Sequence, residues 1–242
     1  MNELLLVASI LVIYGSVLVM YWLFDESGLY CFTVLATITA NIEVLIMIRA
    51  FGMEQTLGNV LFAANFLITD ILSEVAGKKK AQKAVNIGIA VSIVFILLSQ
   101  MWLLYRPSSE DWVMPAIKTV FSNTPRMMIV GIVTYAIVQR FDVWAYHKWW
   151  GLTKNKTGDS RKFLWLRNNG STLISQLLNT IIFTIGAFAG TYTTPVLFSI
   201  GISSYIIFIV TSLVDTPFIY GARKIHDYKI RGKNKIDIKI RK

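Results

Sequence analysis

The chain from Asn168 to Val214 reads NNGSTLISQLLNTIIFTIGAFAGTYTTPVLFSIGISSYIIFIVTSLV, and it contains no aspartate, glutamate, lysine or arginine. A helix needs about 20 predominantly apolar residues to cross a bilayer, so this stretch is too long for one helix. The polar segment Thr191–Pro195 divides it, and proline beside small polar residues favours a turn. The stretch therefore predicts two membrane-spanning helices joined by a tight turn.

The composition of the whole chain also indicates a membrane protein. Hydrophobic residues make up 55% of the 242 residues and charged residues 16%, whereas a soluble domain usually carries about 25% charged residues. A disordered chain, a coiled coil and a small disulfide scaffold are thereby excluded. The single cysteine, Cys31, can form no intrachain disulfide, and one cysteine with two histidines is too few for a usual zinc site.

Five further apolar segments resemble membrane spans. Leu4–Phe24 and Ala84–Tyr105 are free of charge, whereas Leu29–Ile48, Leu57–Ser73 and Thr119–Gln139 include polar residues. The start of the chain lacks the basic region of a signal peptide, so we interpret the first segment as a retained helix. The predicted fold class is all-α, a polytopic membrane helix bundle of about seven transmembrane helices.

The basic residues are distributed unevenly over the predicted loops. With the C-terminus inside, the inner segments 25–28, 74–83, 140–167 and 222–242 hold 20 of the 24 lysines and arginines, and the outer loops hold three. The positive-inside rule then predicts a multi-pass plasma-membrane protein with a cytoplasmic C-terminus. Seven spans place the N-terminus outside, and a re-entrant third segment would place it inside.

We expect two parts of unequal size. Residues 1–221 are predicted to form a single transmembrane helical domain, and residues 222–242 a basic cytoplasmic tail. Such a tail can contact anionic lipid headgroups. It has too few aromatic residues to suggest nucleic-acid binding, so we expect no nucleic-acid partner.

The chain lacks the motifs of several enzyme classes. It has no GxxxxGK[ST] phosphate loop, GxSxG elbow or HExxH pair. No histidine lies in a predicted span where it could begin a catalytic set. We therefore expect no enzyme activity, no metal and no cofactor, and any energy from ATP would have to come from a partner chain.

Polar residues within and beside the predicted spans form two groups at different depths. Each is a candidate functional residue, because an ionisable side chain in the membrane is costly unless it faces water or a partner. The mid-depth group, a candidate substrate site, comprises Asn41, Glu43, Asn65, Arg126, Gln176, Asn179 and Tyr205. The group near the inner ends, a candidate inner gate or structural charge network, comprises Asp70, Glu74, Asp142, Arg167 and Asp215.

The spacing and chemistry of these residues favour a binding cavity. Gln176 and Asn179 are three residues apart and share a helix face. Amides both donate and accept hydrogen bonds and suit the edge of a flat heterocycle, with Tyr205, Phe66 and Phe183 as candidate stacking rings. Interhelical hydrogen bonding is the alternative for either amide alone. In the inner group we predict Arg167 as the hub, because a guanidinium can hold two carboxylates.

Four motifs resemble the queuosine precursor transporter family, within the vitamin uptake transporter group. They are TDILSEVAGKKKAQKAV (Thr69–Val85), NTPRMMIVGIVTYAIVQRFDVWAYHKW (Asn123–Trp149), WLRNNGSTLISQLLNT (Trp165–Thr180) and YIIFIVTSLVDTPFIYG (Tyr205–Gly221). The resemblance covers roughly residues 33–221. It implies a six-helix family core preceded by an extra N-terminal helix, Leu4–Phe24.

The resemblance implies import of 7-deazaguanine bases, such as 7-cyano-7-deazaguanine, 7-aminomethyl-7-deazaguanine or queuine, for queuosine modification of tRNA. It also implies kinship with the substrate-binding subunits of energy-coupling-factor importers. The alternative function is such a subunit for another vitamin-like heterocycle. Facilitated, ion-coupled and ATPase-driven transport all stay open, as does a homodimer.

Individual positions carry the resemblance, and two depart from it. The matching residues are Asn41, Asp70, Glu74, Arg126, Gln139, Asp142, Arg167, Ser171, Gln176, Asp215 and Pro217. Asn179 stands where an aspartate is usual, and Phe208 stands where many members have a lysine. If these two residues form a pair in relatives, both halves are replaced here, which predicts a shift of substrate within the deazapurine class.

Overall fold

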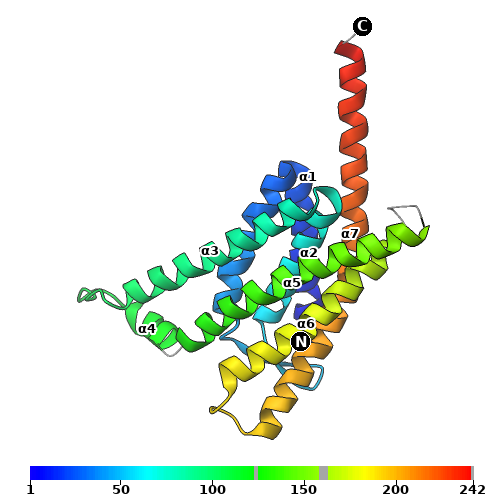
Figure 1. Cartoon of the computed structure of the whole chain (residues 1–242). Coiled ribbons are helices and arrows are strands. Elements are labelled where there is room, and N and C mark those ends of the chain that lie inside the picture. The colour runs from blue at the N-terminus through cyan, green and yellow to red at the C-terminus, as the bar shows by residue number, and fades with distance from the viewer. Residues whose placement is uncertain (123–124, 158–162, 241–242) are drawn as a thin grey trace.

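The computed structural model describes residues 1–122, 125–157 and 163–240. Within these residues the elements are α1 (Asn2–Glu43), β1 (Met47–Ala50), β2 (Met53–Thr56), α2 (Gly58–Val75), α3 (Lys78–Trp102), α4 (Met114–Ser122), α5 (Pro125–Thr157), α6 (Leu164–Phe188) and α7 (Thr194–Ile240). Every helix except α4 is long and apolar enough to cross a membrane. This confirms the predicted all-α membrane bundle (Figure 1).

Helix α1 consists of two segments that run in opposite directions. Asp25 has φ 54° and ψ −140°, a non-helical conformation that bends the helix. The second segment returns the chain to the level of its first residues. There Asn2 Nδ2 donates to the Arg49 carbonyl at 2.9 Å, and the Phe51 amide donates to Glu3 Oε1 at 3.3 Å. Figure 1 shows the blue ribbon rising to the bend and descending to the strands. Helix α1 therefore supplies the first two predicted spans.

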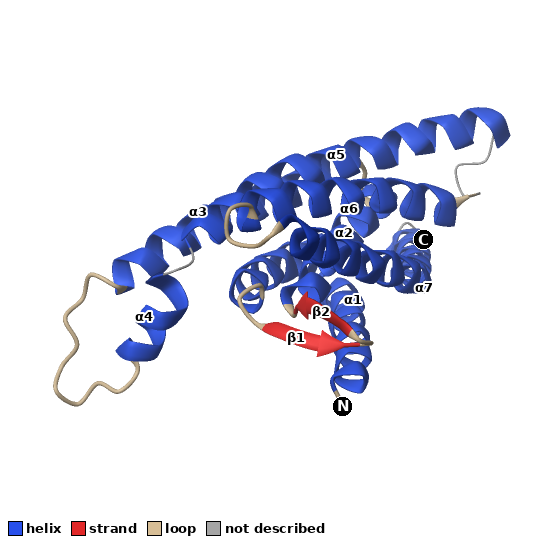
Figure 2. Ribbon diagram, turned by 90° about the horizontal axis from the view of Figure 1, so that it is seen from below, coloured by secondary structure: helices blue, strands red, loops and turns tan. Residues whose placement is uncertain are grey.

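A β-hairpin between α1 and α2 was not predicted from the sequence. The predicted span Leu29–Ile48 is too long, because α1 ends before the hairpin begins. The two strands are antiparallel, with Met47 opposite Thr56 (Figure 2). Phe51 and Gly52 in the two-residue turn have φ of 52° and 75°, the left-handed conformation that a type I′ turn requires at both positions.

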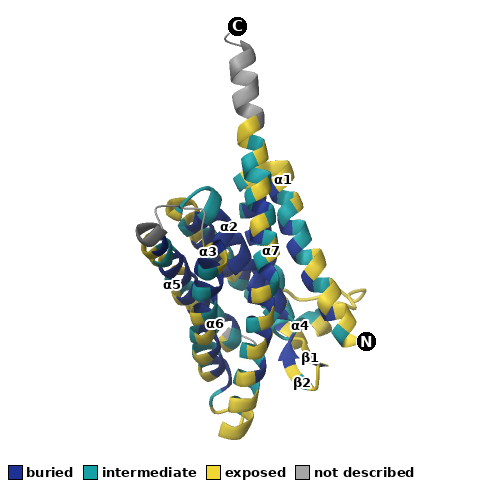
Figure 3. Cartoon of the chain, turned by 90° about the vertical axis from the view of Figure 1, so that its right-hand side faces the viewer, coloured by how far each residue is buried: buried dark blue, intermediate teal, exposed yellow. Residues whose placement is uncertain are grey.

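Helix α2 lies at the centre of the bundle, where it packs against α1, α3, α5 and α7. Most of its residues are buried, including the polar side chains of Asn65, Thr69 and Asp70. The short third predicted span is therefore a helix surrounded by protein. Exposed residues lie on the outward faces of the surrounding helices (Figure 3). Many of them are large and apolar, as expected where lipid is the solvent.

The fifth predicted span, Thr119–Gln139, begins too early. Residues Met114–Ser122 form the separate short helix α4, and α5 begins at Pro125. Proline is favoured in the first turn of a helix, where its missing N–H would have no intrahelical partner. Arg126 therefore lies in the first turn of α5, at the start of the span that this helix provides.

Salt bridges help to define the two ends of the bundle. At the bend in α1, Asp25 contacts Lys229 of α7 and Glu26 contacts Lys80 of α3. We call this the bend end, and we call the opposite end, which carries the strands, the hairpin end. Helix α7 continues past the predicted domain boundary at residue 221 and extends beyond the bundle at the bend end (Figure 1).

Candidate functional site

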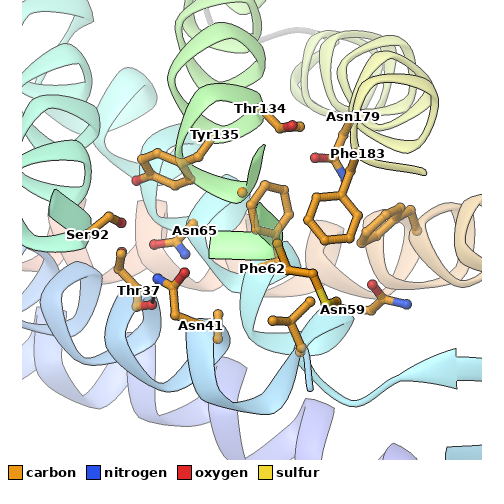
Figure 4. Close-up of a pocket in the computed structure, with 16 residues that line it drawn as sticks. Thr37, Asn41, Asn59, Phe62, Asn65, Ser92, Thr134, Tyr135, Asn179 and Phe183 are labelled. Atoms are coloured by element: carbon orange, nitrogen blue, oxygen red, sulfur yellow. Dashed lines mark hydrogen bonds between the residues drawn. The ribbon is translucent and has the colours of Figure 1, made fainter. Parts of the chain in front are cut away.

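A cavity of about 70 Å³ lies among the helices near the β-hairpin. All six long helices contribute side chains to it, so it is assembled from segments distant in the sequence (Figure 4). None of the described residues that line it is charged. The cavity therefore suits a neutral ligand, which would lose no ionic hydration on entering it.

Close packing of α2 on α1 forms one wall of the cavity. A Cβ atom on Gly58 would lie 2.8 Å from the Val44 amide nitrogen and 3.0 Å from the Ala40 carbonyl oxygen. A larger residue could not be placed there without moving backbone, so Gly58 permits this contact between the helices. The contact brings Asn41 of α1 and Asn59 of α2 to the same cavity.

Gly131 of α5 forms part of the opposite wall. A Cβ atom added there would lie 3.9 Å from Phe183 Cε2 and 4.0 Å from Asn41 Oδ1, which are ordinary contact distances. Alanine would fit at this position without strain. A longer side chain would extend into the space between the amide and the ring, so Gly131 keeps that space open.

Four asparagines, Asn41, Asn59, Asn65 and Asn179, provide the amide groups of the lining. Asn41 Nδ2 is used within its own helix, where it donates to the Thr37 carbonyl at 2.8 Å. Among the described residues, Asn59 Nδ2, Asn65 Oδ1 and Thr134 Oγ1 are buried without a hydrogen-bond partner. Such atoms cost about 1–3 kcal/mol each when unpaired, so water or a polar ligand must supply their partners.

Aromatic rings form the apolar part of the cavity. The Phe62 ring centroid lies 6.0 Å from that of Tyr135 and 6.4 Å from that of Phe208. Phe183 contributes a further ring from α6 (Figure 4). Rings beside amides and hydroxyls can contact both the face and the edge of a flat heterocycle.

The structure places three of the seven predicted mid-depth residues in the cavity lining, namely Asn41, Asn65 and Asn179. The other four, Glu43, Arg126, Gln176 and Tyr205, are not among the lining residues. Gln176 is buried elsewhere in the bundle, and Glu43 is half-buried at the last residue of α1. The Tyr205 hydroxyl donates to the Leu173 carbonyl at 3.5 Å, which joins α7 to α6.

Arg126 occupies a structural position at the hairpin end. Its Nε donates to the Gly186 carbonyl at 3.0 Å, and its Nη2 donates to the Ala189 carbonyl at 2.7 Å. These carbonyls lie at the C-terminus of α6, where backbone oxygens lack intrahelical donors and the helix dipole favours a cation. Arg126 thus caps α6 and joins it to α5.

Sequence reasoning missed much of the cavity lining. Asn59 lies at the start of α2 and lines the cavity. It falls within the predicted third span but was not among the candidate site residues. Thr37, Phe62 and Tyr135 also line it and have no distinguishing sequence signal. Phe183 was a candidate ring and does line the cavity, whereas Phe66 packs behind Phe62 at a centroid distance of 5.7 Å.

The predicted inner group lies toward the bend end, and its ion pairs centre on a glutamate. Glu74 accepts from Arg167 Nη2 at 2.7 Å, from Arg223 Nη1 at 2.9 Å and from the Tyr146 hydroxyl at 2.9 Å. The Arg167 guanidinium also lies 4.7 Å from the centroid of the Trp150 ring. The sequence-based hypothesis made Arg167 the hub of this group. In the structure Glu74 of α2 contacts residues of α5, α6 and α7.

The three aspartates of this group are fully buried and lie near one another. Asp70 Oδ2 accepts from the Thr172 hydroxyl at 3.0 Å, and Asp215 Oδ1 accepts from Asn168 Nδ2 at 2.7 Å. Asp142 lies close enough to Asp70 to interact with it electrostatically. Residues from α2, α5, α6 and α7 thus meet in one polar cluster, and its role as an inner gate or a structural network stays a prediction.

A family model described as "Putative vitamin uptake transporter" matches residues 56–222. The "Probable queuosine precursor transporter" of Bacillus subtilis (strain 168) is 36% identical over 209 residues, which is 86% of this chain and 89% of the relative. No solved structure matches. This chain therefore belongs to the vitamin uptake transporter family, whose members are transporters and not enzymes.

Proposed function

We propose that this transporter imports 7-deazaguanine bases and binds them in the uncharged cavity. The observation that carries the proposal is the cavity itself, in which amides, hydroxyls and aromatic rings from six helices converge without a charged side chain. The name of the Bacillus subtilis relative supports the substrate class.

The lining matches the chemistry of a deazaguanine. Such a base presents ring N–H and amino donors and a carbonyl acceptor along its edge, and carboxamides can pair with both kinds of group. Asn65 Oδ1 offers a buried free acceptor, and Asn59 Nδ2 offers a buried free donor. Phe62 and Phe183 offer faces for stacking.

The neutrality of the cavity favours one base over the others. Asn179 and Phe208, the two residues that depart from the pattern of the family resemblance, both line the cavity. With neither the usual aspartate nor the usual lysine present, no lining residue offers a charge to a ligand. We infer a preference for the neutral 7-cyano-7-deazaguanine over the cationic 7-aminomethyl-7-deazaguanine and over queuine, which carries a secondary amine.

The direction of transport follows from the distribution of charge. Lysines and arginines concentrate in the segments at the bend end and in the extension of α7. By the positive-inside rule the bend end faces the cytoplasm, and the hairpin end, with the cavity beside it, faces the outside. We propose that the base enters from the hairpin end and leaves at the bend end.

An uptake assay tests the proposal. Cells that can neither synthesise nor import deazaguanines should accumulate labelled 7-cyano-7-deazaguanine only when they express this chain. Asn65→Ala should raise the half-saturation concentration roughly fivefold or more, because one buried hydrogen bond is worth about 1–3 kcal/mol. The matched control is Asn86→Ala, which removes an exposed amide of α3. If cells that express the unmodified chain took up no labelled base, the proposed function would be refuted.

A further inference from the structure

Two buried carboxylates lie near each other within the bundle, one on α2 and one on α5. The side chains of Asp70 and Asp142 are both fully buried, and they are close enough to interact electrostatically. Two ionised carboxylates cannot share a dry site without strong repulsion. One proton held between them removes that repulsion and provides the donor of a hydrogen bond.

The surrounding donors do not satisfy this pair. Asp142 faces the hydroxyls of Ser171 and Ser175, but those hydroxyls donate to carbonyls of their own helix at 2.9 and 2.8 Å. Both oxygens of Asp142, and Oδ1 of Asp70, have no hydrogen-bond partner among the described residues. Thr172 supplies one donor, to the other oxygen of Asp70. The geometry thus leaves a position for a proton on the pair itself.

The neighbouring charged and titratable groups have contacts of their own. They are Glu74 of α2, Tyr146 of α5, Arg167 of α6, Asp215 and Arg223 of α7, and Tyr14 of α1. Glu74 binds both arginines and the Tyr146 hydroxyl. Asp215 is bound by Asn168.

A row of polar side chains connects the pair to the cavity. Asn65, which lines the cavity, is one helical turn from Thr69 on α2, and Asp70 follows directly. The Thr69 hydroxyl lies 3.2 Å from Gln139 Oε1, and Gln139 and Asp142 share a face of α5 at a spacing of three residues. Thr69 and Gln139 therefore join α2 to α5 beside the two aspartates, on the side toward Asn65.

We propose that Asp70 and Asp142 together hold the coupling proton of this transporter, so that one proton moves inward with each base. This inference rests on the proposed function. The pair takes up a proton from the outer side when the base is bound and releases it to the cytoplasmic side when the base leaves. No covalent bond changes, and the proton gradient supplies the energy.

Purified full-length protein in proteoliposomes tests this coupling in two assays with labelled 7-cyano-7-deazaguanine. Counterflow, which exchanges internal for external base at equal pH, needs no driving ion. Accumulation is measured with the outside one pH unit more acidic, a gradient that can support about tenfold concentration of a base carried with one proton. The wild type should perform both, and Asp142→Asn and Asp70→Asn should retain counterflow and lose accumulation. Asp111→Asn, at an exposed aspartate, should behave as the wild type.

A pH-sensitive dye inside the vesicles gives a measurement that needs no variant. Addition of unlabelled base to wild-type vesicles should acidify the lumen, with one proton entering per base. Absence of counterflow by the wild type would contradict the proposed function. Counterflow with neither acidification nor a response to the pH gradient would overturn proton coupling alone, as would accumulation that depends on a sodium gradient.

Discussion

Replacement of Gly131 by leucine should block transport by filling the cavity. The first carbon of the new side chain would lie 3.9 Å from Phe183 Cε2 and 4.0 Å from Asn41 Oδ1, so it fits without strain. The remaining three carbons must extend into a cavity of about 70 Å³. Binding of a base would then force the side chain into strained packing, which costs about 1–3 kcal/mol. We therefore expect affinity to fall by roughly 5- to 150-fold.

Binding of labelled 7-cyano-7-deazaguanine to purified protein, with uptake in cells, measures this loss. Gly131→Ala should bind within about threefold of the wild type, because its Cβ makes only ordinary contacts. Gly151→Leu is the matched control on the same helix, since a Cβ there meets no atom within 4 Å among the described residues. If Gly131→Leu bound the base as tightly as Gly151→Leu did, the cavity would not be the binding site.

Three further predictions concern the ionic cluster, selectivity and topology. Arg167→Ala should destabilise the purified protein by about 1.5–3 kcal/mol, because Glu74 loses one of its two charged partners, whereas Lys79→Ala at an exposed position should leave thermal unfolding unchanged. Equal melting temperatures of the two variants would contradict a stabilising role for the Arg167–Glu74 pair. Asn179→Asp should shift competition uptake toward 7-aminomethyl-7-deazaguanine and queuine, and a preference for amines in the unmodified chain that this change leaves intact would contradict the argument from neutrality. A reporter fused after Lys242 should be cytoplasmic and a tag before Met1 should be external, and an external reporter would reverse the proposed direction of transport.

The spans were predictable because a helix that crosses a bilayer needs about 20 predominantly apolar residues, and runs of that length are recognisable in a sequence. The charge-free stretch Asn168–Val214 forms the helices and turn that its composition indicates. The bend at Asp25 separates two segments that the apolar pattern already divided. The β-hairpin was missed because its apolar residues continue the preceding span, and the turn at Phe51 and Gly52 gives only a weak local signal.

The candidate site was predictable only in part, for a reason of geometry. Asparagines such as Asn41, Asn65 and Asn179 are conspicuous in apolar segments, and all three line the cavity. Depth along a helix does not tell which way a side chain faces. Gln176 was therefore grouped with Asn179, although it does not line the cavity, and Arg126 was grouped with the site although it caps α6.

The contacts of Glu74 hold four helices together at the bend end of the bundle. Glu74 joins α2 to α5, α6 and α7 through Tyr146, Arg167 and Arg223 at the bend end. On the proposed path a base leaving toward that end would pass these contacts, so its release would require α2 to separate from at least some of its partners. Separation strands buried charges unless water or a proton compensates them. Because the cavity's Asn65 and the cluster's Glu74 lie on the same central helix, motion of α2 would open the exit and rearrange the binding site together.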